Sequence, residues 1–453
     1  MPSEVYRIIG SRIDQIKMNY SGDLDHQTKR LVSCLLFIYP ILLLSVRDGA
    51  SVCFVLLIVV SSCYFFMKDW RNIVGWSQGD IGFAVAMFGL IGAILVSDAF
   101  HRSFKLSSLD GASRFLFSIP IYSLLRQMPL AVPRSLEYGF PLGALAGLLT
   151  SIFFPSIHWV VGTYFVDSIR FGGASLALGF LSLATINWTR KDPPAMLALK
   201  LGGFSIGLYC AIHSAARGAW VSIPVILLIL GYYKFEGKRR AKHVAAMVSV
   251  VIALASYQLV PQVHDRIAVT QSEFTSILAG HFDTSIGIRL QIWGAAIQLI
   301  RENPIAGVGP TGLPAALRAM HQSGAIDDYV LDLGIAETHN EILSHTVKLG
   351  VLGLLAILAI YLVPAILFAA ATSSSDQIKR NAGVTGMLFV VTYFIFGLTV
   401  ETFNIKTFAT FYAMTVACLL AVARYSAPQA ADRADPPCGR LETAFKASAS
   451  GLR

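Results

Sequence analysis

Long runs of apolar residues with almost no charge recur from residue 31 to residue 424 of this 453-residue chain. Each run is close to the roughly 20 residues with which an α-helix crosses the hydrocarbon core of a bilayer. Only 14% of the residues are charged, whereas a soluble domain carries about 25% because it needs a hydrated surface. The runs lack the alternation of a barrel strand, and lipid admits only helices or closed barrels. The sequence therefore predicts an all-α integral membrane protein.

About twelve transmembrane helices are predicted from these runs. Their ranges are 31–46, 50–67, 81–99, 113–125, 138–155, 173–188, 195–214, 218–233, 243–260, 340–370, 382–400 and 407–423. An even number of spans places both termini on one side of the membrane. Lys and Arg concentrate in the terminal segments and in the loops on that side, which the positive-inside rule identifies as the cytoplasm. The net charge of +9 follows from this bias and predicts no nucleic-acid partner.

The segments outside the spans complete the predicted organisation. Residues 1–30 form a cytoplasmic amphipathic segment on the membrane surface, with a disordered tail as the alternative. We expect no signal peptide, because residues 1–30 contain no apolar stretch followed by a small-residue cleavage site. Residues 425–453 form a disordered cytoplasmic tail. The six cysteines lie in apolar runs or in this tail without CxxC spacing, which favours neither a disulfide framework nor a cysteine metal site.

Between spans 1–9 (residues 31–260) and spans 10–12 (residues 340–424) lies a large loop, residues 261–339. Loops this long are usually functional or disordered. This one carries helical signals: Thr284 and Ser285 can cap a helix that ends at Asn303-Pro304, and a second helix is predicted from Pro314 to His321. We therefore expect an ordered, helical periplasmic loop domain.

Two arginines near the outer ends of the spans are candidates for anion binding. Arg217 lies in a tight connection between two spans, where an arginine is costly unless it faces water, an anion or a partner; snorkelling to lipid headgroups is the alternative. Arg289 shares a helix face with Trp293 among apolar neighbours. Its guanidinium fork suits a phosphate or carboxylate, and an ion pair with an acid of the same loop is the alternative.

His339, where the large loop meets the tenth span, is the candidate general base. An unperturbed histidine pKa near 6.5 suits that role at neutral pH, and a structural histidine is the alternative. Residues 307–312 fit G-x-G-x-x-G, but no strand precedes them, so we expect turns rather than a nucleotide site. No residues are assigned to a metal.

Five short motifs in register resemble the O-antigen ligase and polymerase superfamily of bacterial envelope glycosyltransferases. They are S-x-x-R-G-A-W (214–220), G-x-R-x-x-x-W (287–293), N-P-x-x-G-x-G-x-x-G (303–312), T-H-N-x-x-L (338–343) and L-G-x-x-G (349–353). The resemblance runs from about Arg170 to Gly353, and the N-terminal half matches only in hydropathy.

The resemblance implies a C-type glycosyltransferase-like fold and a metal-independent, inverting enzyme without a cofactor. Its donor would be a glycan on undecaprenyl diphosphate, and its active site would face the periplasm from the inner membrane. Arg217 and Arg289 would bind the donor diphosphate, His339 would deprotonate the acceptor hydroxyl, and Arg170 would add a further contact.

Three functions remain in view. A ligase transfers the glycan to lipid A–core, whereas a polymerase extends the glycan on the lipid diphosphate; the single large loop favours the ligase. A transporter of lipid-linked glycans is the non-enzymatic alternative, because Lys348 is predicted to lie about two turns into the tenth span.

Overall fold

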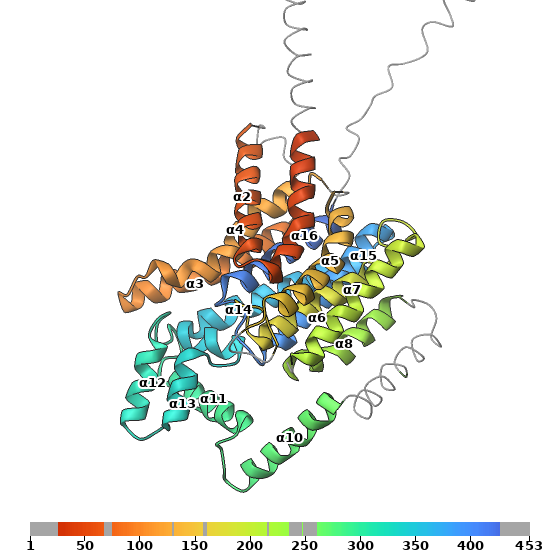
Figure 1. The fold of residues 1–453 in the computed structure, drawn as a ribbon. Helices are drawn as coiled ribbons and strands as arrows, with labels where there is room; N and C mark the ends of the chain where they lie inside the picture. The colour runs from red at the N-terminus through yellow and green to blue at the C-terminus, as the bar shows by residue number, and fades with distance from the viewer. Residues whose placement is uncertain are drawn as a thin grey trace, which may run out of the picture.

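The computed structural model describes residues 26–67, 75–128, 131–156, 161–214, 217–234, 247 and 261–425, and these residues form an all-helical bundle (Figure 1). Among them, seven helices are long and apolar enough to cross a membrane: His26–Ser45, α2 (Gly49–Met67), α3 (Gln78–His101), α5 (Ala131–Phe153), α7 (Pro194–His213), α14 (Glu341–Thr372) and α16 (Lys406–Ala423). The bundle also contains η2 (Leu106–Leu109), α4 (Asp110–Leu125), α6 (Ser168–Ala184), α8 (Arg217–Lys234) and α15 (Gln377–Gly397). The predicted all-α membrane class is confirmed.

Each predicted span except 243–260 coincides with one of these helices. That ninth span lies outside the described residues, apart from residue 247. The predicted amphipathic segment up to residue 25 and the tail from residue 426 lie outside them as well.

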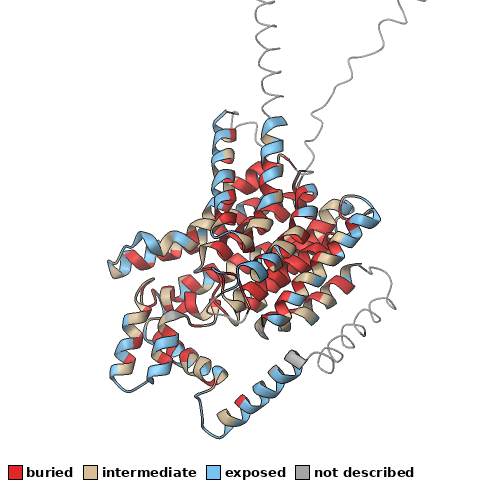
Figure 2. Cartoon of the chain, in the orientation of Figure 1, coloured by how far each residue is buried: buried red, intermediate tan, exposed pale blue. Residues whose placement is uncertain are grey.

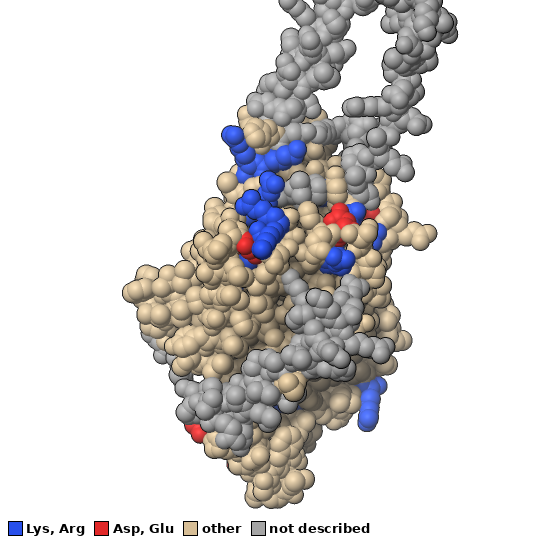
Figure 3. Space-filling model, turned by 90° about the vertical axis from the view of Figure 1, so that its right-hand side faces the viewer, with Lys and Arg blue, Asp and Glu red and all other residues tan. Residues whose placement is uncertain are grey.

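The outward faces of the bundle are apolar. Buried residues concentrate where the helices meet, and α16 is almost fully enclosed, with 94% of its residues buried (Figure 2). Large apolar side chains are exposed along α2, α3 and α14, among them Val52, Leu56, Val85, Phe88, Leu355 and Ile366. Figure 3 shows one side of the molecule, where Lys and Arg gather in one part and a broad uncharged surface adjoins them. An exposed apolar surface of this extent fits contact with lipid.

The large loop forms four helices within the described residues: α10 (Pro261–Leu278), α11 (Ser285–Glu302), α12 (Leu313–Gln322) and α13 (Asp328–Ala336). α11 and α12 match the two predicted helices, and the Thr284 hydroxyl caps α11 by accepting the Gly287 N–H at 3.1 Å. We call α11–α13 the loop-helix cluster. Its core, with Ile292, Leu317 and Val330, includes Val347 of α14, so the cluster is packed onto one end of the bundle (Figure 1).

The glycine-rich segment 303–312 is inserted into a break in α14. Gly350 has φ 64° and ψ −150°, which interrupts the helix. The N–H groups of Val308 and Gly309 donate to the carbonyls of Val347 and Lys348 at 2.9 and 3.0 Å. A Cβ on Gly350 would lie 2.2 Å from the Ile305 carbonyl oxygen, so no larger residue fits this contact.

Turns at Gly307 and Gly309 (φ 66° and 91°) shape the same segment, as predicted for the G-x-G-x-x-G stretch. The end of α3 holds it from the other side: the Ser97 hydroxyl donates to the Ala306 carbonyl at 2.8 Å, and His101 Nε2 lies 3.0 Å from the Gly307 carbonyl oxygen. The segment therefore joins the loop-helix cluster to both α3 and α14.

Candidate functional site

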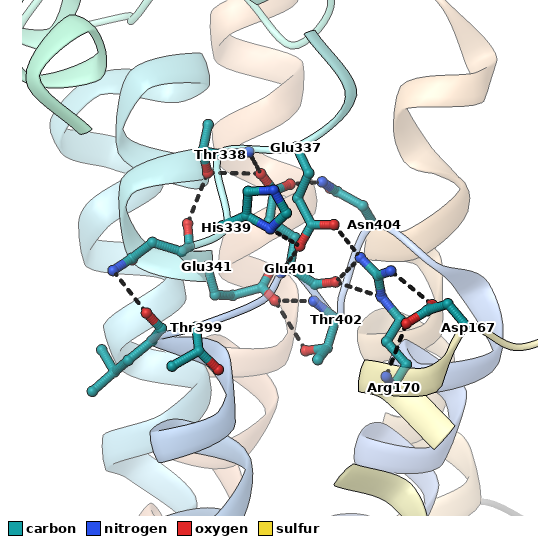
Figure 4. Close-up of polar contacts among 12 residues, drawn as sticks. Asp167, Arg170, Glu337, Thr338, His339, Glu341, Thr399, Glu401, Thr402 and Asn404 are labelled. Carbon is teal, nitrogen blue, oxygen red and sulfur yellow. Dashed lines mark hydrogen bonds and ion pairs between the residues drawn. The ribbon is translucent and has the colours of Figure 1, made fainter. Parts of the chain in front are cut away.

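Two connections meet at the loop-helix end of the bundle. Backbone N–H groups of each connection donate hydrogen bonds to carboxylates of the other. One precedes α14 and the other joins α15 to α16. The N–H and hydroxyl of Thr338 donate to Glu401 Oε1 at 2.6 and 2.7 Å, and the N–H of Glu401 donates to Glu337 Oε1. The N–H and hydroxyl of Thr402 donate to Glu341 Oε2 (Figure 4). Because each connection supplies the other's partners, the two form one unit.

Arg170 fastens α6 to this unit. Its guanidinium donates to Asp167 Oδ2 at 2.9 Å, to Glu337 Oε2 at 2.6 Å, and to the Glu401 carbonyl oxygen at 2.8 and 3.0 Å. Asp167 is also the N-cap of α6, since it accepts the Arg170 N–H. All of these contacts are internal to the protein, and the predicted contact of Arg170 with the donor stays a prediction.

His339 lies at the centre of the unit in an uncommon backbone conformation, with φ 55°. A non-glycine residue at positive φ is held there by its surroundings and marks a candidate functional position. The side chain is 16% exposed. Its Nδ1 is buried without a hydrogen-bond partner, and Glu337 Oε1 lies 3.7 Å from it.

Burial is the main cause that lowers the pKa of His339, to about 4, and the positive charges of Arg289 and Arg170 act in the same direction. Glu401 opposes them. The imidazole is therefore neutral at pH 7 and able to accept a proton.

Arg289 is close enough to His339 for its positive charge to act on the imidazole. Arg289 lies on α11, and Trp293, four residues later on the same helix, donates its indole N–H to the Thr338 carbonyl at 3.0 Å. The tryptophan therefore holds α11 against the connection that carries His339. Arg289, one helical turn before the tryptophan, lies on the same face of α11.

Arg217 is the first residue of α8, and its side chain lies outside the described part of the structure. Its backbone neighbour Gly218 contacts the connection between α15 and α16, where an added Cβ would lie 2.0 Å from Thr399 Oγ1. Trp220 closes the turn between α7 and α8 by donating to the Ala211 carbonyl at 2.9 Å. The start of α8 is thus placed beside the segment that carries Glu401.

An ion pair between a partly buried lysine and a buried glutamate joins α14 to the unit. Lys348 Nζ lies 3.3 Å from Glu401 Oε2 and 2.7 Å from the Ser344 hydroxyl. Burial alone would raise the pKa of Glu401, but Lys348 and the hydrogen bonds from Thr338 outweigh it and lower the pKa to about 2. Lys348 precedes the break at Gly350. It therefore belongs to the short first segment of α14, at the loop-helix end of the bundle, rather than to the long apolar segment that follows.

A cavity of about 270 Å³ opens next to these charges. Its lining includes Glu337, Lys348 and Glu401, together with Pro310 and Thr311 of the glycine-rich segment. The unit thus places a neutral imidazole, on which the charge of Arg289 acts, next to Glu337, and Glu337 in turn lines the adjacent cavity.

The acids of the unit, and Asp167 outside it at the N-cap of α6, were not singled out from the sequence. Glu337 and Glu401 had a usable signal, because both stand at the loop-side ends of predicted spans, as His339 does. Asp167 had a weaker one, three residues before Arg170.

Residues 202–358 match the family model described as O-antigen ligase. The matched stretch includes Arg217, Arg289 and His339, together with the glycine-rich segment. An uncharacterized protein of Haemophilus influenzae is 21% identical to this chain over 387 residues, which cover 82% of this chain and 93% of that protein.

Proposed function

Because residues 202–358 place the chain in the O-antigen ligase superfamily, as its motifs predict, we propose that it is a glycosyltransferase of lipopolysaccharide assembly. It transfers a glycan from undecaprenyl diphosphate to lipid A–core. The enzyme spans the inner membrane with both termini in the cytoplasm, and the loop-helix end of the bundle faces the periplasm.

The observation that carries this proposal is His339 itself, a largely buried imidazole held at φ 55° in the connection before α14, on which the charge of Arg289 acts. The acceptor hydroxyl loses its proton to His339 as its oxygen forms a bond to the anomeric carbon of the donor sugar. The bond between that carbon and the diphosphate oxygen breaks, and its electron pair leaves with the diphosphate. Attack from the opposite face inverts the anomeric centre.

The leaving diphosphate gains negative charge during this step, and arginines stabilise such charge without a metal ion. We assign that role to Arg289 and, from its place in the matched family region, to Arg217. Arg170 holds Glu337 and the Glu401 carbonyl in place, and a further contact of Arg170 with the donor remains part of the proposal.

Reconstitution in proteoliposomes with an undecaprenyl-diphosphate glycan tests the proposal. Lipid A–core is offered as acceptor in one arm and a second donor molecule in the other. Glycan on lipid A–core supports a ligase, and a lengthened lipid-linked glycan identifies a polymerase instead. Movement of the donor across the bilayer without any transfer would point to a transporter and contradict the proposal.

Two variants test the assigned roles in the same assay. His339→Ala removes the proton acceptor and is expected to abolish transfer while donor binding stays intact. Arg289→Lys keeps the charge but loses the fork, and is expected to lose most activity because an ammonium cannot bind the diphosphate bidentately. Near-wild-type rates in either variant would remove that residue from the mechanism.

A further inference from the structure

The Nδ1 atom of His339 is buried, accepts or donates no hydrogen bond, and lies 3.7 Å from the nearest carboxylate oxygen, Oε1 of Glu337. A buried polar atom without a partner costs free energy, and each such atom in a folded protein needs a reason. The gap exceeds a normal N–H···O distance by about 0.7 Å. Hydrogen bonds of a catalytic base are often long before substrate binds and tighten afterwards.

Two contacts hold the side chain of Glu337 in place. Arg170 holds its Oε2 at 2.6 Å, and the N–H of Glu401 is bound to its Oε1. Its side chain is 13% exposed. The other carboxylate near the ring, that of Glu401, already accepts from Thr338, Lys348 and Asn404. Oε1 of Glu337, which accepts the N–H of Glu401, can therefore accept a second hydrogen bond, from the imidazole.

We propose, on the basis of the function proposed above, that Glu337 is the positioning residue of His339. Its Oε1 accepts the hydrogen of Nδ1, which fixes the tautomer and leaves Nε2 free to take the proton of the acceptor hydroxyl. When Nε2 is protonated, the adjacent carboxylate stabilises the imidazolium, and the proton passes to water after the diphosphate has left. The same arrangement orients histidine bases in hydrolases, where an acid holds the second ring nitrogen.

The charges around the ring make such a partner necessary. Arg289 on α11 and Arg170 on α6 both disfavour a positive imidazolium, and Glu401, in the connection between α15 and α16, is partly neutralised by Lys348. Burial raises the pKa of Glu337 and Arg170 opposes that rise. A negative Glu337 next to Nδ1 is the charge that balances the protonated ring in the transition state.

Glu337→Gln tests this, because it keeps the size of the side chain and an oxygen for the Glu401 N–H while removing the charge. We expect kcat to fall by about tenfold or more. The acid limb of the pH–rate profile should move to lower pH, because loss of the negative charge disfavours the imidazolium. Glu337→Asp, which keeps the negative charge, should leave the acid limb near its wild-type position.

Asp167→Asn is the matched control. It removes the other carboxylate bound to Arg170 yet retains a good N-cap for α6. We expect its kcat and acid limb to stay near wild type. Equal losses in Glu337→Gln and Asp167→Asn with an unmoved limb would overturn the proposal, since Glu337 would then act only through Arg170. A Glu337→Gln enzyme with wild-type kcat would overturn it as well.

A measurement without turnover separates this inference from the proposed function. Histidine-selective NMR in nanodiscs, with the His339 signal identified by its loss in His339→Gln, gives the tautomer and pKa of the ring. We expect a lower pKa in Glu337→Gln than in wild type. An unchanged pKa and tautomer would refute the positioning role, whereas absence of glycan transfer by the wild type would refute the function alone.

Discussion

Glu401→Gln is expected to lower the free energy of unfolding by about 3 kcal/mol. The Glu401 side chain is 2% exposed and lies between α15 and α16, outside the spans. Lowering its pKa from 4.5 to about 2 corresponds to about 3 kcal/mol, because each pKa unit is worth about 1.4 kcal/mol. The glutamine also leaves the partly buried ammonium of Lys348, 19% exposed, without its counter-charge, and this loss is already part of the effect of the pKa shift.

The sign of the pH dependence follows from the direction of this shift. A carboxyl whose pKa is lowered on folding stabilises the native state fully above its unfolded value of 4.5. That stability is lost as the pH falls from about 4.5 towards 2. Wild type should therefore lose stability over this window, and Glu401→Gln should lose much less.

Equilibrium unfolding in mixed detergent micelles, followed by circular dichroism at rising SDS fraction, measures the effect. Lys348→Met should cost a similar amount, and the double variant Lys348→Met/Glu401→Gln should cost clearly less than the sum of the two. Asp110→Asn is the control, because its 3.1 Å pair with Arg114 involves an aspartate that is 56% exposed and should contribute less than about 1 kcal/mol. A Glu401→Gln variant within about 0.5 kcal/mol of wild type, or a strictly additive double variant, would refute the buried ion pair.

Further predictions concern the helix break and the base. Gly350→Ala should lower the free energy of unfolding by about 2–4 kcal/mol, because the position has φ 64° and the new Cβ would meet the glycine-rich segment; Gly202→Ala, where an added Cβ meets nothing within 4 Å, should be neutral in the same titration. Arg289→Gln should raise the pKa of His339 above about 4, as read by NMR, and an unchanged value would show that the two side chains are not neighbours. The acid limb of kcat should lie at higher pH than that of kcat/KM, since the bound diphosphate adds negative charge near His339; coincident limbs would contradict a donor bound next to the base.

The helices and one cap followed from the sequence because their signals are local. Apolar runs of bilayer length predicted the spans, and Thr284 together with Asn303 predicted both ends of α11. α10 and α13 were missed because their sequences mix polar and apolar residues without a long apolar run. The position of α13 depends on packing in the loop-helix cluster, where Val330 is fully buried, rather than on local pattern alone.

The unit around His339 could be predicted only in part. The sequence placed His339, Arg217 and Arg289 on one side of the membrane, and the structure brings Arg289 and Arg170 to the histidine. The hydrogen bond from the N–H of Glu401 to Glu337 joins residues 64 positions apart, and no local pattern encodes such a pairing. The role of Arg170 was uncertain for the same reason, since both carboxyl-bearing partners had to be located first.

The break in α14 bears on the choice between a transporter and a transferase. A transporter is expected to carry ionisable residues near the middle of the membrane, at broken helices. The broken helix is present, but Lys348 lies on its loop-helix side and is paired with Glu401. Lys200, the other basic residue within a predicted span, is fully buried against Asp192 at 2.9 Å, near the start of α7. Both lysines are therefore paired with carboxylates near helix ends. In the described part of the chain, the charged residues proposed to act in catalysis lie around His339, at the loop-helix end of the bundle.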